Sequence, residues 1–159
     1  MQENAELRRM VANEKELQSL YHREVLDAAK NPERFGRLQE LTHKAIGLNP
    51  LCGDKVEIEL LIDEVGIKHY RFQATGCALC IASGSAIGAL VESQSVSLAA
   101  SFANITLQAL AEQNPSILPR GMQLFNHVHQ FPTRGKCASL APRTLLAALT
   151  GEISPVSCE

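Results

Sequence analysis

The chain has 159 residues, a length that allows one domain with a substantial core and is short for two. Hydrophobic residues make up 45% of it and charged residues 20%, a balance typical of a globular protein and not of a disordered or fibrous one. The formal net charge of -2 provides no basic field to hold nucleic acid or an anionic membrane, and with aromatic residues at only 4% base stacking is also disfavoured.

No targeting or membrane-spanning segment is expected. Residues 1–16 are too charged for a signal peptide, and the longest mostly apolar stretch, residues 78–91, is too short to cross a bilayer. We therefore expect a cytoplasmic location. Thiols stay reduced there, so the five cysteines are expected to be metal ligands or reactive thiols and not disulfides.

The first expected element is a helix that starts at Leu17. Apolar residues recur at helical spacing from Leu17 to Ala28. Asn31-Pro32 should end this helix, because the residue before a proline is kept out of helical geometry. Residues 1–16 are assigned to an N-terminal extension that is either helical or loose.

Three strands are expected next. Residues 43–48 are a weak candidate for the first. Residues 55–62 and 67–74 alternate between apolar and polar side chains, which is typical of strands with one buried face. Because only residues 63–66 separate them, these two strands should form an antiparallel hairpin.

The remainder of the domain is expected to be mainly helical, over residues 77–93 and 95–113 and in a last helix. We place the start of the last helix near Ser139, because Pro142 is tolerated only in the first turn of a helix. Gly151 is a fitting stop.

These elements make a single domain over residues 17–151. Residues 152–159 are expected to be a loose tail.

Three cysteines fall where expected elements begin or end. Cys52 lies in a turn just before the strand 55–62, Cys77 lies between the hairpin and the next helix, and Cys137 lies at the start of the last helix. In a sheet with helices on one face, these ends can meet at one edge. The positive end of a helix dipole would also favour the thiolate of Cys77.

The residue types at these positions indicate a metal site. Zinc takes thiolates at about 2.3 Å in a tetrahedral arrangement, and three cysteines leave one position to fill. Asp54 is two residues after Cys52, so in an extended backbone both side chains point the same way and can bind one ion. Arg134 and Lys136, just before the third cysteine, could offset the negative charge of such a site.

Four parts of the chain resemble the U-type iron–sulfur cluster assembly proteins, the family of SufU, IscU and the N-terminal domain of NifU. They are Leu20-Tyr21-His22-Arg23-Glu24-Val25 with Asn31-Pro32 and Phe35-Gly36, Asn49-Pro50-Leu51-Cys52-Gly53-Asp54, Gly76-Cys77-Ala78-Leu79-Cys80-Ile81-Ala82-Ser83-Gly84-Ser85, and Phe131-Pro132-Thr133-Arg134-Gly135-Lys136-Cys137-Ala138-Ser139-Leu140. The resemblance covers residues 20–149. It implies an α+β fold of the SufE/NifU type, a small antiparallel three-stranded sheet with helices packed on one face. Lys136, where IscU proteins have histidine, and the long segment before it point to the SufU branch.

The resemblance also implies a function in iron–sulfur cluster assembly, with Cys52, Asp54, Cys77 and Cys137 as the ligands of Zn²⁺. In this interpretation the chain accepts persulfide sulfur from a SufS-like cysteine desulfurase, on Cys52 or Cys137. An alternative is a scaffold on which the same ligands hold iron or a 2Fe–2S cluster. Downstream iron–sulfur assembly or acceptor proteins would be further partners. Either role is that of a sulfur acceptor or scaffold and not of a stand-alone enzyme.

Cys80 opens an alternative from another class. It replaces the usual serine of the family and creates a Cys77-x-x-Cys80 pair, which could ligate metal, act as a redox pair or only fill space. A CxxC thiol-redox protein would need a thioredoxin-like βαβ pattern, which the sequence does not show. A binding module with structural zinc is the other alternative. We interpret His22 as structural, and His127 and His129 as a solvent-exposed pair.

Overall fold

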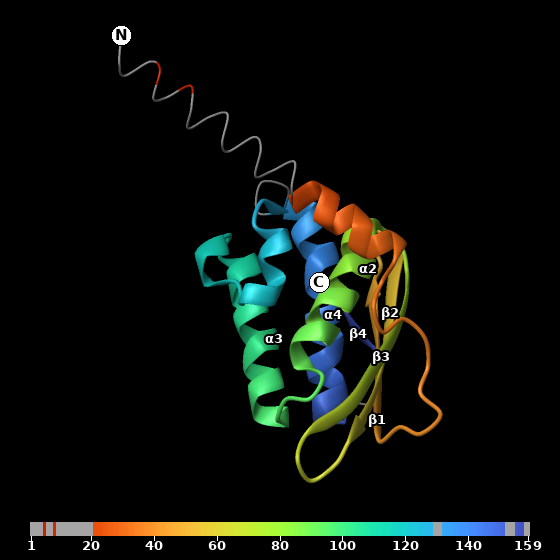
Figure 1. The fold of residues 1–159 in the computed structure, drawn as a ribbon. Coiled ribbons are helices and arrows are strands. Elements are labelled where there is room, and N and C mark those ends of the chain that lie inside the picture. Colours follow the sequence, from red (N-terminus) through yellow and green to blue (C-terminus); the bar gives the residue numbers. More distant parts are fainter. Residues whose placement is uncertain (1–4, 6–7, 9–20, 129–131, 152–154, 158–159) are drawn as a thin grey trace.

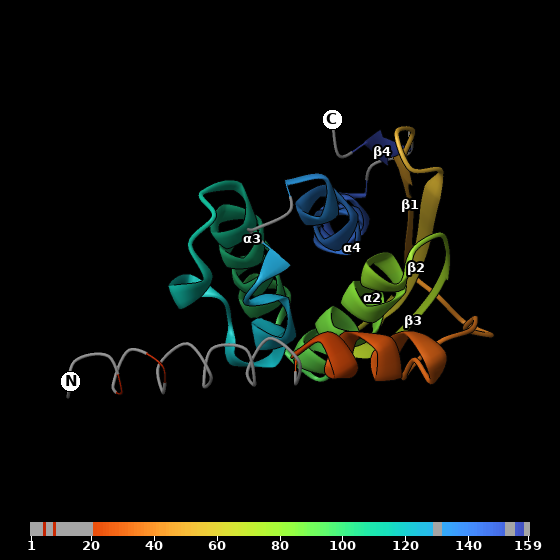
Figure 2. The ribbon, with the colours of Figure 1, turned by 90° about the horizontal axis from the view of Figure 1, so that it is seen from above.

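The structure, a computed structural model, describes residues 5, 8, 21–128, 132–151 and 155–157. The helices and strands follow one another in this order: a helix that includes residues 21–30, β1 (His43–Asn49), β2 (Asp54–Ile62), β3 (Ile67–Thr75), α2 (Ala78–Val91), α3 (Val96–Ala111), η1 (Pro115–Ile117), η2 (Arg120–Phe125), α4 (Pro132–Thr150) and β4 (Val156–Ser157). The chain forms layers, with α2 and α4 packed on one face of the sheet and α3 packed on the far side of these two helices (Figures 1 and 2). This confirms the expected α+β class. None of the helices in the described part of the chain combines the length and apolar character that a bilayer crossing requires.

The sheet has four strands in the order β3-β2-β1-β4. β1, β2 and β3 pair antiparallel, as expected from the sequence. The fourth strand was not predicted: β4 pairs parallel with Gly47 and Leu48 of β1. The prediction of a loose tail is therefore wrong for Val156–Ser157, because two residues are too few to show a periodic pattern. The other tail residues except Pro155, and residues 1–16 except Ala5 and Arg8, lie outside the described residues.

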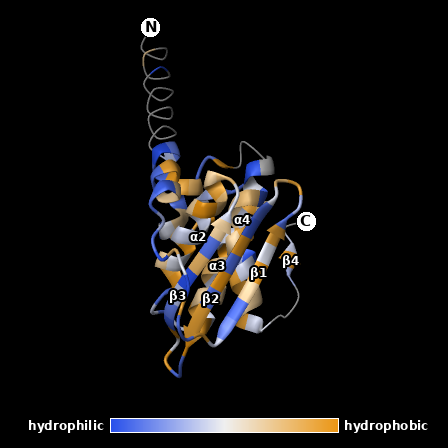
Figure 3. Ribbon diagram, turned by 90° about the vertical axis from the view of Figure 1, so that its right-hand side faces the viewer, coloured by the Kyte–Doolittle hydropathy of each residue, from blue (hydrophilic) through white to orange (hydrophobic). Residues whose placement is uncertain are grey.

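The buried face of the sheet carries the alternating apolar residues that the sequence pattern picked out. Val56, Ile58 and Leu60 of β2 and Tyr70 and Phe72 of β3 have no exposed surface. Hydrophilic and hydrophobic residues alternate along these strands (Figure 3). Burying the apolar side of each strand against α2 and α4 is what holds the sheet to the helices.

Two glycines let α2 lie directly on the aromatic side chains of β3. A Cβ on Gly84 would come within 2.5 Å of the Phe72 ring, and one on Gly88 would overlap the ring of Tyr70. The Tyr70 hydroxyl donates a hydrogen bond to the Gly84 carbonyl at 2.8 Å, so the buried phenol is satisfied. This close contact fixes the height of α2, and with it the position of the helix's first residues, above the sheet.

Helix α4 begins at Pro132, so the prediction of a start near Ser139 was wrong, and Pro142 lies inside the helix. A proline cannot donate to the carbonyl four residues before it, which here is that of Ala138. The Ser83 hydroxyl of α2 donates to this carbonyl at 2.6 Å in its place. A tertiary contact therefore compensates for the missing bond of the helix. Ser139 does not cap a helix; its hydroxyl donates to the Lys136 carbonyl.

We expect Ser83→Ala to lower the free energy of unfolding by about 1–3 kcal/mol, because it leaves the buried Ala138 carbonyl without a donor. In a Pro142→Ala background the cost should be smaller, since the new backbone N–H can bond to that carbonyl. Urea unfolding of the wild type, both single variants and the double variant measures this coupling. An equal cost of Ser83→Ala in both backgrounds would contradict the explanation.

Candidate metal and sulfur site

Three chain segments meet at one end of the sheet. Asn49 and Asp54 are paired at the end of the β1–β2 ladder, and the turn between them carries Cys52. β3 ends beside the start of β2, with Thr75 paired to Lys55, so Cys77 follows next to Asp54. α4 packs over β1 and β2 and brings Cys137 to the same place.

The Asp54 carboxylate is at the centre of this cluster and is only 2% exposed. Its Oδ1 accepts a hydrogen bond from the backbone N–H of Cys77 at 3.0 Å. Its Oδ2 lies 3.4 Å from Asn49 Nδ2, which donates to it, and 3.9 Å from Cys77 Sγ. These partners offset the cost of burying a carboxylate and hold it in one orientation.

Asn49 is a site residue that the sequence analysis missed. It is 1% exposed, and its Nδ2 also lies 3.8 Å from Cys137 Sγ. Asn49 stands in the same motif as Cys52, but its role depends on the cross-strand pairing with Asp54. The sequence alone did not indicate that pairing.

The thiols lie close together but differ in exposure. Cys137 Sγ is 3.7 Å from Cys52 Sγ, and the ligand atoms of Cys52, Asp54 and Cys137 all lie within 4.8 Å of one another. Cys52 and Cys77 are exposed, whereas Cys137 is 4% exposed. The structure thus brings three of the four predicted ligand residues into one group, and Cys77, which is outside this group, lies next to it with its Sγ 3.9 Å from Asp54 Oδ2.

This arrangement fits a tetrahedral zinc ion. Metal–sulfur bonds of about 2.3 Å at tetrahedral angles hold two thiolates about 3.8 Å apart, close to the separation of Cys52 and Cys137. Thiolates with one carboxylate are also donors that zinc accepts. Cys52, Asp54 and Cys137, whose ligand atoms lie within 4.8 Å of one another, therefore suit this ion, and Cys77 is the nearby fourth candidate.

The electrostatics of the cluster also favour a cation. Burial raises the pKa of the Cys137 thiol, and hydrogen bonds and charges of Asp54 and Cys77 raise it further. A carboxylate and a second thiol so near disfavour another negative charge. A divalent ion among these groups reverses that balance, because a coordinating thiol is deprotonated outright.

The structure also places the other predicted positions. Cys137 lies within α4 and not at its start, since the helix begins at Pro132. Arg134 and Lys136 are both exposed on α4. Cys80 has no exposed surface and belongs to the hydrophobic core beneath α2.

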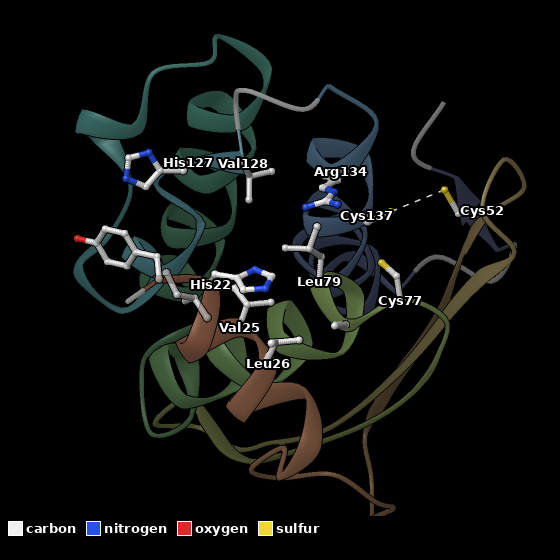
Figure 4. Close-up of a pocket in the computed structure, with 13 residues that line it drawn as sticks. His22, Val25, Leu26, Cys52, Cys77, Leu79, His127, Val128, Arg134 and Cys137 are labelled. Carbon is white, nitrogen blue, oxygen red and sulfur yellow. Dashed lines mark hydrogen bonds between the residues drawn. The ribbon is translucent and has the colours of Figure 1, made fainter. Parts of the chain in front are cut away.

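A pocket of about 630 Å³ opens beside the cysteines, between the helix of residues 21–30, the start of α2, η2 and α4. Its lining residues are Tyr21, His22, Val25, Leu26, Cys52, Cys77, Ala78, Leu79, Leu124, His127, Val128, Arg134 and Cys137. The three cysteines lie on one side of the pocket and His127 on the opposite side (Figure 4). Most of the lining is apolar, so the thiols border a hollow that could admit an extended group.

Two histidines are placed differently from the sequence interpretation. His22, taken there as structural, is exposed and lines the pocket. His127, expected to be solvent-exposed, is half-buried with its ring centroid 5.7 Å from that of Tyr21. His129 lies outside the described residues.

Comparison with known proteins identifies the family. The sequence profile of the NifU-like N-terminal domain matches residues 20–150. The chain belongs to this family. The zinc-dependent sulfurtransferase SufU of Bacillus subtilis (strain 168) is 28% identical over 131 residues, which cover 81% of this chain and 88% of that protein. The iron–sulfur cluster assembly scaffold protein IscU of Streptococcus pyogenes serotype M1 is 32% identical over 136 residues, 84% of each chain.

The fold also matches that of a known NifU-like protein. The crystal structure of the N-terminal part of a nitrogen-fixing NifU-like protein from Brucella abortus superposes with a TM-score of 0.73 at 23% identity. The superposition covers 80% of this chain and 90% of the Brucella abortus chain. The arrangement of sheet and helices is therefore that of the family.

Gly76→Ala should weaken metal binding by about tenfold or more, because Asp54 would have to move from its place. A Cβ on Gly76 would overlap the Asp54 carboxylate, and φ at this residue is +138°, which an alanine rarely adopts. Zinc affinity measured by competition with a chromophoric chelator tests this.

Gly135→Ala is the matched control. It lies on α4 two residues from Cys137, and a Cβ there would have no heavy atom within 4 Å. It should leave zinc affinity unchanged. Equal zinc affinity of the Gly76→Ala variant and wild type would mean that the close approach of Gly76 does not position Asp54.

Proposed function

We propose that this chain is an iron–sulfur cluster assembly protein that accepts persulfide sulfur at Cys52, in a metal site completed by Asp54, Cys77 and Cys137. The observation that supports it most is the pair of thiols 3.7 Å apart, one exposed and one buried, beside a buried carboxylate. Family membership adds to it, since relatives are named as a sulfurtransferase and as a cluster scaffold.

Cys52, Asp54, Cys77 and Cys137 would hold Zn²⁺ as the resident ion. Zinc, when bound, keeps its thiol ligands deprotonated at neutral pH, which is the nucleophilic form of cysteine. Asn49 and the Cys77 N–H keep the carboxylate oriented toward the cluster.

Exposure favours Cys52 over Cys137 as the first acceptor. Cys52 is open to solvent at the edge of the pocket, so the persulfide of a partner can reach it, whereas Cys137 is almost covered. The Cys52 thiolate attacks the outer sulfur of the persulfide, the sulfur–sulfur bond of the donor breaks, and the donor cysteine leaves as a thiolate. The sulfur atom changes carrier without net oxidation or reduction. Cys137, 3.7 Å away, is placed to receive the sulfur from Cys52 in a second exchange of the same kind.

The partner that supplies such a persulfide is a cysteine desulfurase, and proteins that assemble or accept clusters would act downstream. These reactive thiols need a reducing compartment, and we place the function in the cytoplasm. The scaffold role stays the second candidate, with a 2Fe–2S cluster as cargo on the same ligands. It is favoured by the relative named as a scaffold.

Protein purified without chelators under anaerobic conditions should contain about one zinc per chain, bound by three sulfurs and one oxygen. Elemental analysis gives the metal content, and X-ray absorption gives the ligand set. Asp54→Ala should lose the oxygen ligand and exchange zinc faster while keeping every thiol.

Chelation should leave the sheet intact by circular dichroism, because the hydrophobic core is independent of the site. Protein with neither zinc nor iron after gentle purification would refute the metal site. Loss of all secondary structure on chelation would show that the metal is required mainly to hold the fold together.

Cys52→Ala and Cys137→Ala should each abolish the stimulation of a partner cysteine desulfurase. Each substitution removes a metal ligand and, at the same time, a thiol that can carry sulfur. Sulfide release in the presence of a dithiol reductant measures the stimulation, and mass spectrometry locates persulfide on individual cysteines.

Cys158→Ser is the control, because it also removes one thiol, and Cys158 belongs to none of the family motifs. It should keep the wild-type stimulation. If the wild type carries no persulfide on any of Cys52, Cys77 and Cys137 after incubation with the desulfurase, the acceptor role fails. The scaffold role would then be tested by reconstituting the cluster.

A further inference from the structure

The start of α2 carries a second thiol pair, Cys77 and Cys80, of which the proposed function uses only Cys77. Cys77 is the N-cap residue, and the backbone N–H of Cys80 donates to the Cys77 carbonyl at 3.1 Å. A turn closed by such a bond holds its end Cα atoms less than about 7 Å apart. Disulfides span Cα separations of about 4.4–6.8 Å, so the backbone here is suited to one.

The two thiols differ strongly in access. Cys77 is exposed and lines the pocket together with Cys52 and Cys137. Cys80 has no exposed surface and belongs to the hydrophobic core. A reagent can therefore reach Cys77, and Cys80 can react only with a group that Cys77 already carries. An exposed thiol at a helix N-terminus, followed by a buried thiol one turn later, is suited to attack and then resolution.

The pair could supply the electrons that cluster assembly requires. Sulfur in a persulfide is formally at oxidation state zero, whereas the sulfur of an iron–sulfur cluster is sulfide. Two electrons must reach each sulfur atom before it can enter a cluster, and two thiols that close to a disulfide supply two electrons.

We propose that Cys80 resolves a persulfide on Cys77 and releases its outer sulfur as sulfide. The inference rests on the proposed function, since sulfur would reach Cys77 by exchange from the acceptor thiols that border the same pocket. The Cys80 thiol passes its proton to the ionised outer sulfur of the Cys77 persulfide, and the Cys80 sulfur attacks Cys77 Sγ. The bond from Cys77 Sγ to the outer sulfur breaks, and that sulfur leaves as HS⁻. The two cysteines are together oxidised by two electrons and the outer sulfur is reduced by two.

The step has a consequence for the metal site. In the reduced protein Cys77 Sγ lies 3.9 Å from Asp54 Oδ2, within the candidate ligand set. A sulfur bonded to Cys80 is no longer a thiolate ligand, so sulfide release and ligation by Cys77 exclude each other. A cellular dithiol reductant would return both cysteines to thiols and restore the site.

The test uses the full chain, anaerobic conditions and sodium polysulfide as the sulfur donor. After a short exposure the donor is removed, free thiols are alkylated, and non-reducing peptide mapping locates persulfides and disulfides. Sulfide released after donor removal is measured without reductant. The wild type should contain the Cys77–Cys80 disulfide and release sulfide, while a sample without polysulfide keeps both thiols.

Cys80→Ser and Cys80→Ala should accumulate persulfide on Cys77 and release sulfide about tenfold more slowly, because the resolving thiol one turn along α2 is missing. Dithiothreitol should then release that sulfur from both variants. Cys158→Ser, a matched loss of one thiol, should behave as the wild type. Thermal unfolding shows whether the two Cys80 variants remain folded. If they do not, the wild-type peptide map still tests the proposal, because it shows whether the Cys77–Cys80 disulfide forms.

Persulfide that persists on Cys77 of the wild type with no Cys77–Cys80 disulfide would overturn the proposal. Sulfide release by both Cys80 variants at the wild-type rate would do the same. Because polysulfide replaces the desulfurase, these outcomes are independent of whether the desulfurase delivers sulfur to Cys52. A failure of the proposed function would instead appear only in the desulfurase assay.

Discussion

The buried carboxylate of Asp54 connects the parts of the chain that make up the site. It accepts the backbone N–H of Cys77 through one oxygen and the side chain of Asn49 through the other. A carboxylate that is 2% exposed must keep such partners, since losing them would leave a buried charge uncompensated. The start of α2 is thereby held against the β1–β2 turn, and Gly76 provides the room for this contact.

The position of Cys137, the remaining cysteine of the candidate metal site, depends on the packing of α2 against α4. The Ser83 hydroxyl bonds to the Ala138 carbonyl, next in sequence to Cys137, and so allows α4 to continue through Pro142. The same helix α2 therefore provides Cys77 at its N-cap and supports the helix that carries Cys137. Movement of α2 would displace two thiols together, which makes its contact with the β3 aromatic rings part of the site's construction.

The four described cysteines differ in solvent exposure, and this difference suggests a different role for each. Cys52 and Cys77 border the pocket and are open to a donor, Cys137 lies just behind Cys52, and Cys80 lies in the core. In our proposals sulfur is taken up on an exposed thiol and reduced with the help of a buried one. Zinc, if bound as proposed, would keep its thiol ligands in the nucleophilic thiolate form.

Strands β1, β2 and β3, the family resemblance and the four predicted ligand residues could be read from the sequence, because strand alternation and cysteine motifs are local patterns. The start of α4 was misjudged, because the donor that replaces the proline's missing N–H is Ser83, on another helix. The two-residue strand β4 and the role of Asn49 were missed for a related reason, since each exists only through pairing with a distant segment. Burial separates Cys80 from Cys77, a candidate metal ligand, although both cysteines stand in one short motif. Motif spacing thus indicated the candidate residues, whereas which thiols are reachable and which are covered depends on the packing of segments that lie far apart in the chain.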